Sequence, residues 1–177
     1  TVTFYVNGGM KGNGSTGRIN TNYNPYTDGV NFTQDNNSYG VYIGNRVLEN
    51  KADLSALQSG TVGNEVQSIS VSPSIYTYNN NAVSKTNAND IGRGFHAVKR
   101  TASNSWSSTV GGYIGNTFTE ASTSIVNEPF WEYCRAVNTT YSKYTSRYHY
   151  YIFAGSGDID LFLFNSIMEE YYLIPLG

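Results

Sequence analysis

The sequence predicts an all-β sandwich closed by one C-terminal helix. Short runs that alternate apolar and polar residues recur between turn signals every ~8–12 residues, which is typical of a two-sheet antiparallel sandwich. The period changes near the end of the chain. Arg147–Ala154 is a strand-like run, whereas from Asp160, a suitable N-cap, apolar residues recur at helical spacing until Pro175.

The N-terminal third contains three predicted strands. Thr1–Val6 is rich in β-branched and aromatic residues, and a Gly- and Asn-rich loop, Asn7–Gly17, follows it. Arg18–Asn22 is a short strand candidate. Asn24–Gly29 contains Pro and Asp-Gly in the order of a tight turn. Residues 39–43 alternate as a strand with one crowded face.

The middle third predicts a strand and a hairpin. Asn50–Gly60 is expected to be one helical turn or a loop. Glu65–Val71 alternates clearly and predicts a strand. Ser74–Tyr78 and Ala82–Lys85 predict a hairpin around a turn at Asn79–Asn81.

The last third predicts a second hairpin and the closing elements. Gly94–Thr101 and Ser105–Val110 are strands joined by a turn at Ala102–Asn104. Phe130–Val137 is a further strand, introduced by Pro129. No internal repeat or linker interrupts the chain, so we expect residues 1–177 to form a single domain. This domain could still be the C-terminal part of a longer protein.

Composition bounds the function. The chain has 177 residues, of which 39% are hydrophobic, and its 16 Tyr and 8 Phe can bury a sizeable core. Only 14% of the residues are charged, so the surface must be rich in amides and hydroxyls. The net charge of −2 argues against a nucleic-acid partner. No apolar run is long enough to insert in a membrane, and the single Cys134 excludes an intramolecular disulfide.

Catalytic patterns are missing. A glycosidase needs two carboxylates about 5–9.5 Å apart around the scissile bond. The nearest candidate, Asp158-Ile159-Asp160, is expected to be a loop and helix cap, and Glu169-Glu170 diverge on a helix. Gly155-Ser156-Gly157 is no nucleophile elbow. We therefore expect no catalytic residue, no enzymatic activity, no metal and no cofactor.

Sugar binding is the chemistry that the composition favours, because aromatic rings stack on pyranose rings and amides bond to their hydroxyls. The favoured region is the loop Asn138–Tyr144, with the segment around Trp106 second. The alternative is that each Tyr is an ordinary strand residue with a wet hydroxyl, or part of a subunit interface. The candidate ligand-binding residues are Trp106, Tyr113, Tyr141, Tyr144 and His149.

Several blocks, in one order, resemble a known family. They are residues 20–36 with Ser38–Tyr42, then Gly94–Ser105, then Phe130–Arg135, Thr145–Tyr148 and Phe153–Asp158 with the closing helix. Together they are similar to the concanavalin A-like, laminin G-like jelly-roll domains of tailed-phage structural proteins. The similarity covers roughly residues 19 to 174. It implies two facing antiparallel sheets in a jelly-roll sandwich.

The resemblance also implies a role at an extracellular virion surface, in a fibre, spike or decoration protein. The expected partners are a host-surface polysaccharide or glycan and other virion proteins, in a homo-oligomer such as a trimer. Two alternatives stay open: a purely structural virion subunit, and a lyase-type polysaccharide depolymerase acting through His149, Arg147 and a Tyr. Calcium is a further feature of such domains, but the loop acids Asp28, Asp35, Asp90 and Asp158 are scattered.

Overall fold

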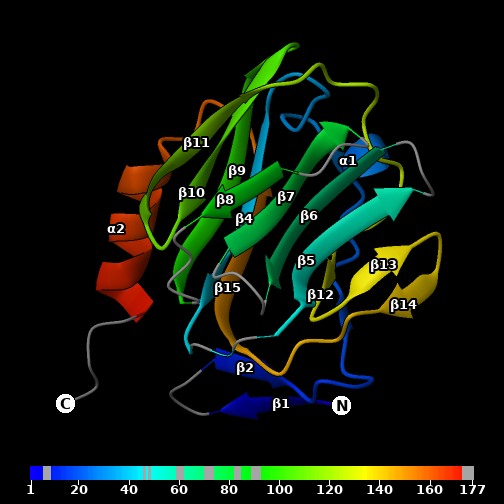
Figure 1. Ribbon diagram of the computed structural model, residues 1–177, viewed down its shortest axis with the longest axis vertical. Helices are drawn as coiled ribbons and strands as arrows, with labels where there is room; N and C mark the ends of the chain where they lie inside the picture. The colour runs from blue at the N-terminus through cyan, green and yellow to red at the C-terminus, as the bar shows by residue number, and fades with distance from the viewer. Residues whose placement is uncertain are drawn as a thin grey trace.

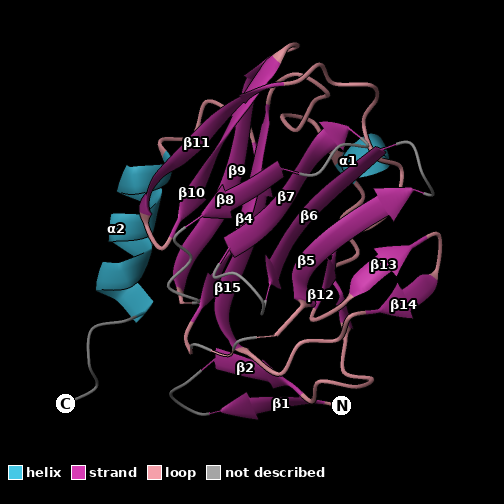
Figure 2. Ribbon diagram, in the orientation of Figure 1, coloured by secondary structure: helices cyan, strands magenta, loops and turns pink. Residues whose placement is uncertain are grey.

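The computed structural model describes residues 1–5, 9–45, 47, 49–58, 62–69, 74–81, 85–88 and 93–172. Two β-sheets face one another, and a helix lies beside the first of them at one side of the molecule (Figures 1 and 2). The predicted all-β, two-sheet jelly-roll sandwich with a C-terminal helix is confirmed.

The first sheet has seven strands, and all of its described pairs are antiparallel. In spatial order they are β1 (Val2–Tyr5), β2 (Gly9–Gly12), β15 (Tyr148–Gly155), β4 (Asn37–Ile43), β9 (Gly94–Ala102), β10 (Ser105–Val110) and β11 (Tyr113–Thr119). Strands from both ends of the chain therefore lie side by side, with β15 between β2 and β4 (Figure 1).

The second sheet has eight strands. Six follow one path: β14 (Thr140–Ser142), β13 (Arg135–Val137), β5 (Lys51–Gln58), β6 (Val62–Ile69), β7 (Ser74–Asn81) and β8 (Lys85–Ala88). The other two are β12 (Trp131–Glu132), which pairs with β5, and β3 (Ile19–Asn20), which pairs with β12. Among the described ladders of this sheet, β13 with β5 is parallel, at Val137↔Leu57, and the others are antiparallel.

The core lies between the two sheets. Alternate residues of each strand point inward, because successive side chains in a strand point to opposite faces. Residues of β4 and β9, such as Val41 and Val98, meet residues of β5 and β6, such as Leu54 and Val66. Aromatic residues from the connecting segments fill the rest, with Phe130 in ring contact with Tyr39, Phe32 and Tyr23.

The helix α2 (Leu161–Tyr172) packs on the outer face of the seven-stranded sheet. Its Phe164 ring lies 4.7 Å from the ring of Phe153 on β15. Asp160 caps it, since a side-chain oxygen of Asp160 accepts the N–H of Phe162 at 3.0 Å. The helix and its cap are therefore confirmed, while Pro175 lies outside the described residues. Within the described ranges, no helix has the length and hydropathy needed to cross a membrane.

The expectation for Asn50–Gly60 is wrong, because residues 51–58 form the central strand β5. Lys-Ala-Asp-Leu-Ser-Ala-Leu has weak strand propensity, so the local sequence favoured a helical turn or loop. Pairing decides the conformation, because β12 pairs with one edge of β5 and β6 pairs with the other, and Leu54 and Ala56 then point into the core.

Other boundaries also differ. Asn79–Asn81 belongs to β7 and is not a turn, because these amides are buried and hydrogen-bonded, as in Asn64 Nδ2 to Asn80 Oδ1 at 3.0 Å. The expected turn Asn24–Gly29 is a short helix, α1 (Pro25–Asp28), and the Asn24 side chain caps it. β2 lies within the expected loop, and β11 was not predicted. The predicted strand Phe130–Val137 is divided into β12 and β13.

Candidate functional site

Two of the five candidate residues are buried. Trp106 on β10 is 2% exposed, and its ring lies 4.4 Å from that of Phe118. His149 on β15 is also fully buried. Neither side chain therefore offers a face to a ligand at the surface. Whether an aromatic residue on a strand points inward or outward depends on how that strand pairs with its neighbours. The local sequence around Trp106 and His149 therefore does not show that they are buried.

The other three candidates reach solvent at two places. Tyr113 is 75% exposed at the turn between β10 and β11. Tyr141 on β14 and Tyr144 just after it are half-buried. The backbone of Tyr144 forms an isolated β-bridge with Ala52. Tyr141 and Tyr144 come from the region that the sequence favoured.

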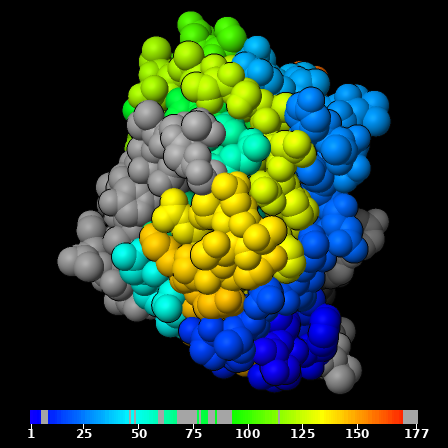
Figure 3. Space-filling model, turned by 90° about the vertical axis from the view of Figure 1, so that its right-hand side faces the viewer, coloured from blue at the N-terminus to red at the C-terminus, as the bar shows by residue number. Residues whose placement is uncertain are grey.

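Tyr141 belongs to an aromatic cluster with a cation. Its ring lies 4.7 Å from the ring of Trp131 in an edge-to-face arrangement. The guanidinium of the exposed Arg18 lies 4.1 Å from the Tyr141 ring and 5.9 Å from the Trp131 ring. We call these three residues the Arg18–Trp131–Tyr141 site. The hairpin that carries Tyr141 occupies the centre of the face in Figure 3, with N-terminal segments below it.

Pairing of β12 explains why Trp131 points outward. β12 is held between β3 and β5, with Trp131 opposite Asn20 and Ser55. Because neighbouring residues of a strand point to opposite faces, Glu132 points into the protein and is buried. One two-residue strand thus supplies a surface aromatic ring and an internal carboxylate.

The backbone around this hairpin adopts conformations that non-glycine residues rarely use. Asn138 and Thr139 have φ of 42° and 67°, as both central residues of a type I′ hairpin turn require. Tyr133 and Lys143, which flank the hairpin, have φ of 69° and 48°. Four of the six positive-φ non-glycine residues found in the described chain are therefore in this short region. Such conformations are enriched at functional sites.

A buried carboxylate lies beneath the same hairpin. Glu65 on β6 is fully buried, and its Oε1 is 3.5 Å from Nε of Arg135 on β13. Lys143 Nζ donates to Gln67 Oε1 at 2.9 Å. Neither oxygen of Glu65 accepts a hydrogen bond from the described residues. Burial raises the pKa of Glu65 to about 7, although the charges of Arg135 and Lys143 oppose this.

Glu65→Gln is expected to make the protein more stable at pH 8 and to change little at pH 5. The pKa of Glu65 is raised from 4.5 in the unfolded chain to about 7 in the folded protein. The stabilisation by the neutral Glu65 carboxyl is therefore complete below pH 4.5 and is lost as the pH rises through about 7. Gln stays neutral, so the gain at pH 8 is about 3 kcal/mol at ~1.4 kcal/mol per pKa unit. Guanidinium unfolding curves of both proteins at the two pH values measure this gain.

The matched control is Glu170→Gln, because Glu170 is exposed on α2. Its effect on the free energy of unfolding should be small at both pH values. An equal effect of Glu65→Gln at pH 5 and pH 8 would show that Glu65 does not titrate in this range.

His149 is part of a buried ionic cluster that joins the two sheets. Its Nδ1 is 2.9 Å from a carboxylate oxygen of Glu132, and its Nε2 is 3.1 Å from a carboxylate oxygen of Asp53. Arg147 Nη1 donates to the other oxygen of Asp53 at 3.3 Å. The ring of Tyr133 stacks on the imidazole at 4.2 Å. All five side chains are buried.

The cluster favours the charged form of His149. Burial alone lowers the pKa of His149, but the hydrogen bonds and charges of Asp53 and Glu132 raise it overall. Burial raises the pKa of Asp53, yet the charge of Arg147 and the hydrogen bond from His149 lower it overall. Both ring nitrogens of His149 are engaged with carboxylates inside the protein. In the described part of the chain, no group of three or more His, Cys, Asp or Glu side chains is arranged so that it could hold a metal ion.

The lyase alternative depends on His149 in a groove, and the structure places His149 inside the sandwich instead. Arg147 is turned to the same interior cluster, where its Nη2 also donates to the carbonyl of Val47 at 2.6 Å. Both residues are therefore engaged in holding the two sheets together. Of the loop acids considered for calcium, Asp28, Asp35 and Asp158 accept hydrogen bonds from Asn24, Ser122 and Asn36. Asp90 lies outside the described residues.

The fold is a jelly-roll sandwich similar to that of a laminin G domain. A solved structure with this arrangement is that of domains LG4-5 of the mouse laminin alpha1 chain, with a TM-score of 0.54 and 13% sequence identity. The match covers 85% of this chain and 41% of the laminin chain, so the present sequence spans about two fifths of that structure. No family model matches the sequence, and no curated protein matches it either.

Sequence reasoning missed three residues of this region. Trp131 was predicted only as part of a strand. Its position directly after Pro129-Phe130, in a chain with few charges, could have marked it as a candidate binding residue. Arg18 lies 123 positions before Tyr141 (141 − 18), so their contact depends on the fold. Glu65 was hidden by the regular alternation of its strand, because nothing local shows that it is buried.

Proposed function

We propose that this domain is a non-enzymatic carbohydrate-binding module and that its ligand stacks on the Arg18–Trp131–Tyr141 site. The observation that carries this proposal is the edge-to-face pair of Trp131 and Tyr141 at the surface, with a cation over one ring. Aromatic side chains present a large apolar face with little conformational entropy to lose, which suits the C–H faces of a sugar ring.

Polar groups around the site supply the hydrogen bonds that a sugar requires. Asn20 lies opposite Trp131, while Asn138, Thr139, Thr140 and Ser142 are exposed on the neighbouring hairpin. Amides and hydroxyls both donate and accept, as sugar hydroxyls do. The hairpin turn is fixed in a type I′ conformation, so these groups are held before a ligand arrives.

The setting that we propose is a virion surface, with a host-surface polysaccharide as the ligand. The sequence resemblance to tailed-phage structural proteins supports this setting, and the surface rich in amides and hydroxyls is compatible with it. Other virion proteins would then be further partners.

Binding of residues 1–177 to an array of purified bacterial surface polysaccharides tests the proposal. The bound polysaccharide is then incubated with the protein and its chain length is measured. Binding without shortening supports a non-enzymatic module. Shortening would replace it with a depolymerase, and failure to bind any glycan would favour a structural role.

Trp131→Ala is expected to weaken binding to a polysaccharide identified in this way by about tenfold or more, since an aromatic contact contributes about 1 kcal/mol or more beyond area burial. Tyr141→Ala should have a similar effect, whereas Tyr141→Phe should retain most of the affinity. Isothermal titration calorimetry with a defined oligosaccharide measures the change.

Tyr113→Ala is the control, because Tyr113 is the more exposed ring but lies at the β10–β11 turn. Its affinity should equal that of the wild type. If Tyr113→Ala weakened binding and Trp131→Ala did not, the ligand would lie elsewhere. Thermal unfolding of each variant separates a lost contact from a lost fold.

A further inference from the structure

Part of β15 has one edge that is unpaired among the described residues. Its first residues, Tyr148 and His149, pair with β2 on one side. From Ile152 to Gly155 its described ladder runs along β4 alone. Within the described residues, this stretch therefore presents one row of backbone groups that no strand covers. An uncovered strand edge can pair with another chain.

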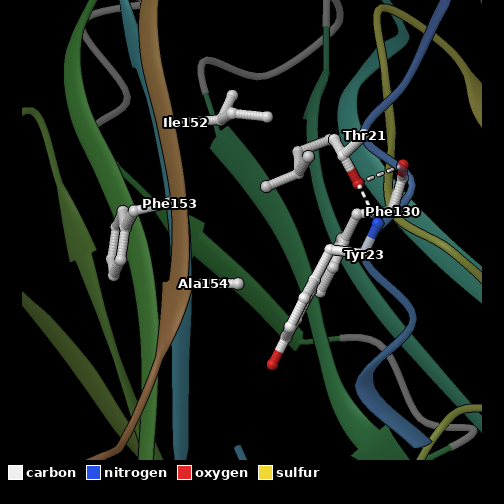
Figure 4. Close-up of a pocket in the computed structure, with 7 residues that line it drawn as sticks. Thr21, Tyr23, Phe130, Ile152, Phe153 and Ala154 are labelled. Carbon is white, nitrogen blue, oxygen red and sulfur yellow. Dashed lines mark hydrogen bonds between the residues drawn. The ribbon is translucent and has the colours of Figure 1, made fainter. Parts of the chain in front are cut away.

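An apolar cavity of about 190 Å³ lies beside this edge, between the two sheets. Figure 4 shows Ile152 and Ala154 pointing toward Tyr23 and Phe130 across it, while Phe153 points to the other face of β15. Ala154 is exposed and Tyr23 is half-buried, so the cavity opens to solvent next to β15.

Apart from the Tyr23 hydroxyl, the described wall of the cavity is apolar, and its other polar groups are hydrogen-bonded within the protein. The Thr21 hydroxyl donates to the Phe130 carbonyl at 2.9 Å, and the Phe130 N–H donates to the Tyr23 carbonyl at 3.0 Å. An apolar cavity of ~150 Å³ accepts a benzene ring. One aromatic or branched side chain therefore matches this cavity in size and chemistry.

The same chain carries a strand with complementary properties. β1 is the edge strand of the seven-stranded sheet and has four residues, as does the open stretch Ile152–Gly155. Its Phe4 is 72% exposed and the next residue, Tyr5, is 43% exposed. β1 has no charged residue, so it matches an uncharged cavity. Figure 1 shows β1 and β2 at the lower edge of the molecule.

We propose that β1 of one copy of this chain adds to the open edge of β15 in a second copy, with Phe4 in the apolar cavity. Backbone hydrogen bonds supply affinity in such strand addition, and a pocket for a side chain supplies selectivity. The two surfaces are different, so the contact is head-to-tail, and a pair of copies keeps one free donor strand and one free acceptor edge. This inference does not depend on glycan binding.

Sedimentation velocity of residues 1–177 over a concentration series up to about 1 mM tests the proposal, because a small interface of this kind is weak. The wild type should form dimers and larger species as concentration rises. Phe4→Asp removes the donor and Ala154→Arg blocks the acceptor, so each variant alone should stay monomeric. An equimolar mixture should form a dimer and nothing larger, since Ala154→Arg still donates and Phe4→Asp still accepts.

Leu163→Asp is the matched control, because Leu163 is exposed on α2, which packs on the face of β15 opposite the cavity, and its variant should assemble like the wild type. Phe4→Asp changes an exposed side chain, so it tests the contact even if Ala154→Arg perturbs the fold. A wild type that is monomeric at 1 mM overturns the proposal. So does a mixture that stays monomeric, or a Leu163→Asp variant that loses assembly.

Discussion

Asp53→Ala is expected to lower the free energy of unfolding by about 3–5 kcal/mol, because it leaves two buried cations without their shared carboxylate. The Asp53 oxygens lie 3.1 Å from His149 Nε2 and 3.3 Å from Arg147 Nη1. Both cations are buried, so water cannot replace the lost charge. Glu132 would remain beside His149, while Arg147 would keep the more distant Glu49, at 3.9 Å.

Guanidinium unfolding at pH 6 measures this loss against a control. Glu120→Ala breaks the ion pair between Glu120 and Lys85. The side chain of Lys85 is 26% exposed and that of Glu120 is 27% exposed. The control should cost about 1 kcal/mol or less, because surface ion pairs contribute little. If the two variants lost equal stability, the buried cluster would be no more important than a surface pair.

The pH dependence gives a second readout of the same variant. The lowered pKa of Asp53 means that its contribution is present above its unfolded value of 3.8 and is lost as pH falls. The raised pKa of His149 means that its contribution is present below 6.5 and is lost as pH rises. The wild type should therefore gain most from the cluster between about pH 4 and 6.5. The free energy of unfolding of Asp53→Ala should fall less than that of the wild type below about pH 4 and above about pH 6.5.

Elements with a clear period were predictable from local sequence. The aromatic strand β15 and the helix α2 were both recognised, because each has a uniform period and a clear end signal in Gly155 or Asp160. β5 was not, because its Ala, Asp and Ser residues have weak preferences and its strand conformation depends on partners on both edges. Pairing between distant segments overrides propensity at such positions.

The candidate site shows the same limit. Tyr141 was identified because its loop is rich in groups that bind sugars, which is a local property. Whether Trp106 or Trp131 is exposed depends on how each strand is paired, and composition does not contain that information. Arg18 joins the site through tertiary contacts alone. The loop that carries Tyr141 could therefore be chosen as a candidate from the sequence, but the residues that meet it in the fold could not.

Arg100→Met is expected to destabilise the protein by about 3 kcal/mol or more. Arg100 on β9 is fully buried between the sheets. Its Nε donates to the Asn79 side chain at 3.0 Å and its Nη2 donates to the Asn79 carbonyl at 3.1 Å. Its Nη1 also reaches the carbonyls of Ala102, Ser103 and Glu120 at 3.1–3.2 Å. Met fills much of the same volume but leaves these acceptors without donors.

This arginine links segments that are far apart in the chain. Asn79 belongs to β7 of the second sheet, and its Nδ2 donates to Asn37 Oδ1 on β4 of the first sheet at 2.9 Å. The Arg100 guanidinium therefore completes a polar connection across the core. Arg100→Lys should recover only part of the loss, because an ammonium group cannot reproduce the planar fork that contacts both Asn79 groups.

Lys99→Met is the control for Arg100→Met, since Lys99 is the preceding residue of β9, points to the opposite face and is half-buried. Its Nζ donates to one carbonyl, that of Ile159, at 2.9 Å, so the cost should be about 1 kcal/mol. Chemical unfolding of the four proteins at one pH should rank them wild type, Lys99→Met, Arg100→Lys and Arg100→Met. A variant Arg100→Met as stable as Lys99→Met would mean that water satisfies the exposed acceptors and that apolar packing alone joins the sheets at this point.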